Sequence, residues 1–164
     1  MDLSTQIQKD IKTLVEGLGF QFLDNPMVHE EDDRFFVDIF VNEPQNLIGE
    51  RGTSLASLQM VMRLIAAKKY RPDIRLDIDV NGYKKKRAEF IKDMAHQARK
   101  QVLSRRAPVA LEPMTAFDRR VIHTTLASFA DVSTGSEGMG PGRHVVVSPQ
   151  QHEGGEHSSS HELS

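Results

Sequence analysis

A Gly-x-x-Gly turn that opens an amphipathic helix is the feature of this sequence that most constrains its fold. Gly49 and Gly52 flank two polar residues, Glu50 and Arg51, and the helix follows at once. Glycine lets the backbone turn sharply and lets a second backbone come close. The amides and the positive dipole end of the helix attract phosphate, and Arg51 adds a full positive charge. The turn therefore predicts a site for a phosphate chain.

The segments around the turn predict a small α+β unit. In chain order we expect a helix over 4–18, strands over 27–31 and 34–41, the turn, a helix to about Tyr70 and a strand over 74–80. Thr53 or Ser54 is expected to cap the helix that follows the turn. This α-β-β-α-β order resembles a type II KH domain, a fold that clamps about four nucleotides of single-stranded RNA over the turn.

The first domain is expected to span residues 1–82, because Asn81 and Gly82 end its last strand. Glu50 places an acid where many KH turns carry a base, and this is expected to weaken contacts with the nucleic-acid backbone. The carboxylates Asp77 and Asp79 alternate with apolar residues along the last strand and are expected to be solubilising surface groups.

Four consecutive cations open the next predicted helix, which extends from residue 83 to about residue 106. They are Lys84, Lys85, Lys86 and Arg87. Positive charge at a helix N-terminus opposes the helix dipole and costs stability, so this run suggests a function in binding phosphate. The alternatives are that the lysines are merely solvated, or that the helix continues from the strand without a free end.

Arg119 and His123 form a second motif, since their spacing puts them on one face of a helix expected over 115–129. Thr115 and Asp118 have the spacing of a capping box at its start. The neighbouring expected strands cover residues 108–112, 132–136 and 143–148. The arrangement resembles an R-3-H domain, a small binder of single-stranded nucleic acid named for this Arg–His spacing. The alternatives are an ordinary solvated pair and a buried, hydrogen-bonded His123.

The combination resembles the Jag (KhpB) family of bacterial RNA-binding proteins over about residues 1–149. The resemblance implies an α+β chain of a KH domain over 1–82 and an R-3-H domain over 83–149, without enzymatic activity. It also implies a cytoplasmic post-transcriptional regulator or RNA chaperone linked to cell shape, elongation and division. A small stand-alone KH protein similar to KhpA is the implied partner. Such proteins usually carry a further N-terminal domain, which this chain is not expected to contain.

The residues expected to contact nucleic acid come from both motifs and from the cationic run. They are Gly49, Glu50, Arg51, Gly52, Lys84, Lys85, Lys86, Arg87, Arg119, His123 and Arg143. The charge distribution supports this choice. Residues 1–50 carry a net charge of −8 and residues 51–150 a net charge of +9, which the overall value of −2 conceals. Basic residues from the turn onward thus provide a local positive field.

The remaining sequence features limit the other functions. The chain has no cysteine, so disulfides, thiolate metal sites and a cysteine nucleophile are excluded. The spacing of His152, His157 and His161 fits no known metal site, and residues 150–164 are expected to form a disordered tail. No catalytic motif and no cofactor site is found. Two alternatives remain: a protein-interaction scaffold for envelope or division factors, which the acidity favours, and binding of single-stranded DNA.

Overall fold

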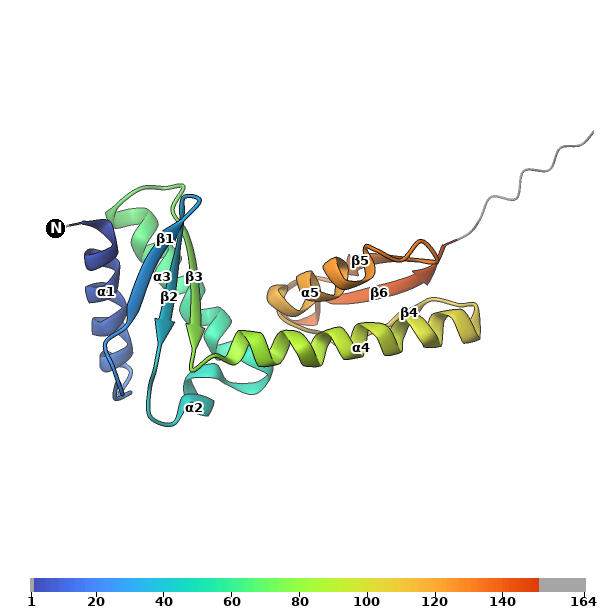
Figure 1. Ribbon diagram of the computed structural model, residues 1–164, viewed down its shortest axis with the longest axis horizontal. Helices are drawn as coiled ribbons and strands as arrows, with labels where there is room; N and C mark the ends of the chain where they lie inside the picture. Colours follow the sequence, from blue (N-terminus) through green and yellow to red (C-terminus); the bar gives the residue numbers. More distant parts are fainter. Residues whose placement is uncertain (1, 151–164) are drawn as a thin grey trace, which may run out of the picture.

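The computed structural model describes residues 2–150, so the expected tail and its histidines lie outside the described residues, except for Gln150. The chain forms a mixed α+β structure with two hydrophobic cores (Figure 1). The first core takes its residues from α1 (Leu3–Gly17), β1 (Met27–Glu31), β2 (Arg34–Ile39), α2 (Pro44–Ile48), α3 (Thr53–Lys69) and β3 (Arg75–Val80). The second takes them from α4 (Tyr83–Arg105), β4 (Val109–Ala110), α5 (Ala116–Leu126), β5 (Val132–Glu137) and β6 (His144–Pro149).

A three-stranded sheet in the order β1-β2-β3 carries the first core. β1 pairs antiparallel with β2, and β3 pairs parallel with β2. Phe35, Val37 and Ile39 are buried on one face of β2, because alternate side chains of a strand point to the same face. α1 and α3 bury their apolar stripes in the same cluster, so both helices cover that face of the sheet (Figure 1).

The second core lies between α4, α5 and an antiparallel sheet in the order β4-β6-β5. Ile91 and Ala98 of α4 meet Ile122 of α5 and Val145 of β6, and all four are buried. α4 also belongs to the first core through Tyr83, its first residue. Since one uninterrupted helix contributes to both cores, it holds the second part against the end of β3 (Figure 1).

Most elements lie close to their predicted positions, with a few exceptions. The strand expected over 34–41 ends at Ile39, because the Val41 N–H leaves the ladder and donates to Asn81 Oδ1 at 3.0 Å. The short helix α2 was not expected; Pro44, whose φ suits a first helical position, begins it. β4 forms only two residues of the five expected, and α5 ends at Leu126.

Candidate nucleic-acid interface

The Gly-x-x-Gly turn needs both of its glycines. Gly49, Arg51 and Gly52 all have positive φ, at +73°, +52° and +81°. A Cβ at Gly49 would lie 2.2 Å from the Ser54 hydroxyl and 2.9 Å from the Ser54 backbone nitrogen. A Cβ at Gly52 would lie 2.9 Å from the Tyr83 hydroxyl. The turn therefore packs against the first residue of α4, which fixes its place relative to the cationic run.

The expectation that Thr53 or Ser54 caps α3 is wrong. Gly52 occupies the N-cap position, and no side chain caps the helix. The Thr53 hydroxyl instead donates to the carbonyl oxygen of Glu50 at 2.9 Å, because Thr53 already lies within the helix. The N-terminus of α3, which is the positive end of its dipole, thus has no capping side chain. Arg51, in the turn just before it, is exposed.

Arg51 reaches across to the second part of the chain. Its Nη1 atom lies 2.7 Å from Oε2 of Glu112, in the segment between β4 and α5. The two side chains are 47% and 76% exposed, so the pair is screened by water and contributes about 1 kcal/mol at most. A phosphate group can therefore compete with Glu112 for Arg51 at little cost.

The four cations that open α4 fall into two classes. Lys84 binds the Asp77 carboxylate and donates to Gln59 Oε1 at 3.0 Å. Arg87 binds Asp118, whose side chain is fully buried. Lys85 and Lys86 are exposed, and neither forms an ion pair with any residue that the structure describes. These two lysines are the members of the run with free charges.

The expectation that Asp77 and Asp79 are solubilising groups is wrong. Asp77 holds the Lys84 ammonium. Asp79 Oδ1 accepts hydrogen bonds from the backbone N–H groups of Val80 and Lys84 at 2.8 and 3.0 Å. Desolvation raises the pKa of Asp79, and the Lys84 amide acts in the opposite direction. Negative charge at the start of α4 suits the helix dipole and offsets the cationic first turn.

Arg119 and His123 lie on one helix face, as their spacing predicts, but neither is free. Arg119 Nη1 donates to the carbonyl oxygen of Met114 at 2.8 Å. His123 Nδ1 lies 2.7 Å from the Thr134 hydroxyl and Nε2 lies 2.9 Å from the Ser136 hydroxyl, both on β5. Desolvation and the nearby Arg119 charge lower the pKa of His123, which favours the neutral ring, and the ring positions the two hydroxyls.

The positive charges of Arg119 and Arg143 repel each other. Desolvation lowers the pKa of Arg119, and the positive charge of Arg143 lowers it further. Arg143 itself is exposed just before β6. The second part of the chain thus carries a pair of neighbouring guanidinium groups beside a hydroxyl-bearing strand, and this surface can bind phosphate.

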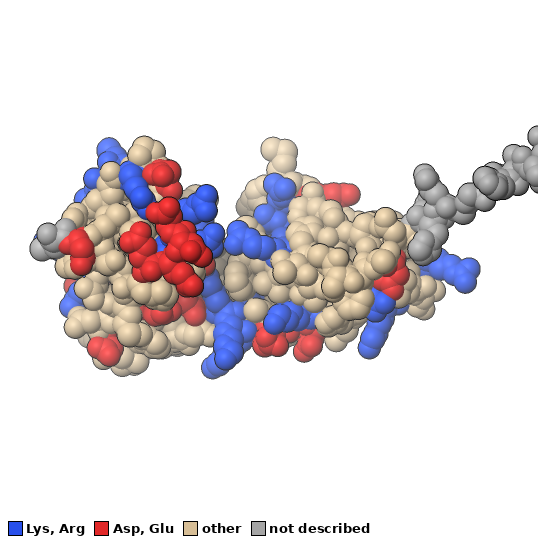
Figure 2. All heavy atoms as spheres, turned by 45° about the horizontal axis from the view of Figure 1, so that its top comes forward, with Lys and Arg blue, Asp and Glu red and all other residues tan. Residues whose placement is uncertain are grey.

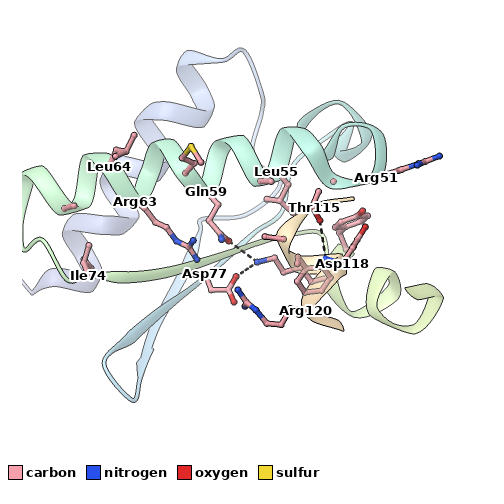
Figure 3. A pocket seen from close by; sticks show the side chains of 18 of the residues that line it. Arg51, Leu55, Gln59, Arg63, Leu64, Ile74, Asp77, Thr115, Asp118 and Arg120 are labelled. Atoms are coloured by element: carbon pink, nitrogen blue, oxygen red, sulfur yellow. Dashed lines mark hydrogen bonds and ion pairs between the residues drawn. The ribbon is translucent and has the colours of Figure 1, made fainter. Parts of the chain in front are cut away.

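The sequence did not predict the groove that begins at the turn. A cavity of about 470 Å³ extends from Arg51 and Gly52 along α3 toward β3, and the start of α5 forms its far wall (Figure 3). Its polar lining residues include Gln59 and Arg63 of α3, Asp77 of β3 and Arg120 of α5. Gln59 and Arg63 are four residues apart on a helix, and that spacing was the one signal of a shared face.

Lys and Arg side chains gather around the junction between the two parts, whereas acidic side chains gather over the N-terminal part (Figure 2). The junction is where the turn, the start of α4 and the start of α5 meet. No group of three or more potential metal ligands occurs within residues 2–150. No described helix is long and apolar enough to cross a membrane.

The R-3-H domain family matches residues 89–149. An RNA-binding protein KhpB of Clostridium symbiosum is 37% identical over 102 residues, which cover 62% of this chain and 46% of the relative. The RNA-binding protein KhpB of Bacillus subtilis is 35% identical over 105 residues, 62% of this chain and 50% of the relative. That of Streptococcus pneumoniae is 26% identical over 145 residues, 88% of this chain and 44% of the relative. The chain thus spans at most half the length of these curated relatives.

Proposed function

We propose that this chain, a member of the Jag (KhpB) family, binds single-stranded RNA through the Gly-x-x-Gly turn and the groove that begins there. The arrangement at the turn supports the proposal. The turn places its glycines at positive φ, leaves α3 without a capping side chain and opens directly into a cavity with cations on its walls. A turn whose glycines carry no side chain, next to a helix N-terminus, suits a phosphate chain.

Residues 1–82 are, in this proposal, a type II KH domain, and residues 83–149 the second, R-3-H unit. The order of helices and strands and the parallel pairing of β2 with β3 support the first assignment. The match to the R-3-H family supports the second. Each unit has its own hydrophobic core, and the chain passes between them at Gly82.

The expected contact residues take different roles in this proposal. Arg51, Lys85, Lys86, Arg119 and Arg143 contact phosphates, since each is exposed or lies beside an exposed cation. Lys84, Arg87 and His123 hold the surface in place, because their polar atoms bind protein groups. Gly49 and Gly52 shape the turn, and Glu50 is an exposed acid that disfavours a phosphate close by.

The cellular role is part of the proposal and rests on the family resemblance. It is post-transcriptional regulation or RNA chaperone activity in the cytoplasm, connected to cell elongation and division, with a KhpA-like partner. The relatives are named as RNA-binding proteins, which favours a binding protein over an enzyme.

A binding titration tests the proposed function. A fluorescently labelled single-stranded RNA, the DNA of the same sequence and the corresponding duplex are titrated with the chain over a range of salt concentrations. We expect the single-stranded RNA to bind tightest, because contacts with the 2′-hydroxyl distinguish RNA from DNA. Equal affinity for RNA and DNA would favour a general single-strand binder. No binding by the folded protein at low salt would contradict the proposal and favour the scaffold function.

A further inference from the structure

We infer that the start of α5 completes the groove of the first part, so that both parts bind one continuous segment of strand. Phe117 stacks against an unpaired base in the cavity, and Arg63 and Arg120 bind the phosphate next to that base. This inference rests on the proposed function and places part of the RNA site in the groove where the two parts of the chain meet.

The two walls of the cavity come from different parts of the chain. α3 supplies Leu55, Gln59 and Arg63, and α5 supplies Arg120 (Figure 3). α5 also supplies Phe117. A volume of about 470 Å³ lies within the range of small-molecule sites, so the cavity has room for a base.

Lys84 fixes Phe117 relative to the groove. The Lys84 ammonium lies 5.7 Å from the centre of the Phe117 ring and donates to Gln59 Oε1 on α3 at 3.0 Å. The buried pair of Arg87 and Asp118 fixes the next residue of α5 to α4. Lys84 and the anchored neighbour Asp118 therefore hold Phe117 on the wall of the groove, which prepares its aromatic ring for stacking.

The α3 wall carries large apolar side chains that the protein leaves uncovered. Met60 and Leu64 are each 65% exposed, and both line the cavity. Exposed apolar side chains on this wall offer a surface to a flat base, whereas the protein gains nothing from exposing them to water. The cavity also includes Gly52 and so continues from the turn, where the proposed function places the backbone phosphates.

The charges at the groove favour an anion. The side chains of Arg63 and Arg120 both extend to the side of the cavity where Asp77 lies (Figure 3). Arg63 Nε donates to the carbonyl oxygen of Leu76 at 2.8 Å. Desolvation lowers the pKa of Arg63, Asp77 raises it, and the like charge of Arg120 lowers it. A phosphate between the two guanidinium groups would relieve their repulsion, because Asp77 is already paired with Lys84.

Substitutions on α5 test this inference with the same labelled single-stranded RNA. Phe117→Ala and Phe117→Leu remove the ring, and we expect each to weaken binding about tenfold, the size of one lost stacking contact. Arg120→Ala is expected to weaken binding and to lower the slope of log affinity against log salt by about 0.7. The matched controls are Phe90→Ala and Arg105→Ala, which remove an exposed ring and an exposed cation of α4 that do not line this cavity. Thermal melting of each variant shows whether it is folded.

Cross-linking locates the base directly. An oligonucleotide that contains 4-thiouridine is irradiated with the unmodified chain, and the linked peptides are identified by mass spectrometry. Links to both α3 and α5 from one thiouridine position support the inference. Links confined to α3, together with unchanged affinity of both Phe117 variants, would overturn it while the proposed function stands. Failure of the unmodified chain to bind RNA would instead overturn the proposed function itself.

Discussion

Arg87 and Asp118 form a buried ion pair between the first turns of α4 and α5, with Nη2 and Oδ2 2.7 Å apart and Nε within 3.2 Å of both carboxylate oxygens. The Asp118 side chain is fully buried, and only 15% of the Arg87 side chain is exposed. The hydrogen bonds to Asp118 raise the pKa of Arg87, so its charge persists. This pair positions α5 beside the groove of the first part.

Asp118→Ala is therefore expected to destabilise the chain by about 3–5 kcal/mol, because it leaves the Arg87 charge buried without a partner. Urea unfolding followed by circular dichroism measures the free energy of unfolding. Glu89→Ala is the matched control, since it removes an exposed pair with Lys92 and is expected to change stability by less than about 0.5 kcal/mol. A similar effect of the two substitutions would contradict the assigned role of Asp118.

Tyr83→Phe is expected to leave the melting temperature unchanged or to raise it. The Tyr83 hydroxyl is buried and has no hydrogen-bond partner among the described residues, and desolvation raises the pKa of Tyr83. Removing an unpaired buried hydroxyl removes its desolvation cost, while the ring that packs against Gly52 is kept. Tyr83→Ala, which also removes the ring, is the comparison and is expected to lower the melting temperature. A clear loss of stability in Tyr83→Phe would reveal a partner for the hydroxyl.

His123 makes stability depend on pH. Its pKa is lowered in the folded chain, so the unfolded chain binds more protons below about pH 6.5. The stabilisation that His123 provides is therefore complete above that pH and is lost as pH falls through the folded-state pKa. Melting at pH 7.5 and at pH 5 measures this loss, and we expect His123→Gln to show a smaller difference than the unmodified chain. An equal difference in both proteins would mean that other groups cause it.

The local residue pattern predicted the helices and strands, whereas contacts between residues far apart in the sequence determine the candidate site. The strand over 27–31 was predicted from its own residues and forms as Met27–Glu31. The partner of Arg87 could not be predicted in this way, because Asp118 lies 31 residues away and its spacing to Thr115 indicated only a helix cap. Thr115 does cap α5, accepting from the Asp118 amide at 3.3 Å, but the carboxylate serves the ion pair instead.

The groove was missed for the same reason. Its walls are α3, β3 and α5, and their proximity depends on the packing of two cores along one helix. The roles of Lys84 and His123 likewise follow from partners on other elements, Asp77 and the β5 hydroxyls. A count of charges and spacings cannot separate such positioning residues from free cations such as Lys85.

Glu112→Gln is expected to strengthen RNA binding, because it releases Arg51 from its ion pair. One additional phosphate contact would increase the magnitude of the salt slope by about 0.7. Arg51→Ala should have the opposite effect, and the double variant should bind like Arg51→Ala alone. Additive effects of the two substitutions would mean that Glu112 acts on the RNA independently of Arg51. Arg51 and Glu112 are exposed, so substituting them tests the turn without the backbone strain that a side chain at Gly49 would cause.

The cationic run at the start of α4 contains both free and paired lysines. Lys85 and Lys86 are exposed and unpaired among the described residues, so the variant with both changed to alanine should keep its stability and lower the salt slope by about 1.4, or two phosphate contacts. Lys84→Ala should instead reduce stability, since it strands Asp77 and frees Gln59, with the salt slope nearly unchanged. RNA anisotropy between 50 and 200 mM salt (roughly the range over which such slopes are measured) and thermal melting on the same samples separate the two roles. A larger slope change from Lys84→Ala than from the double variant would reverse the assignment.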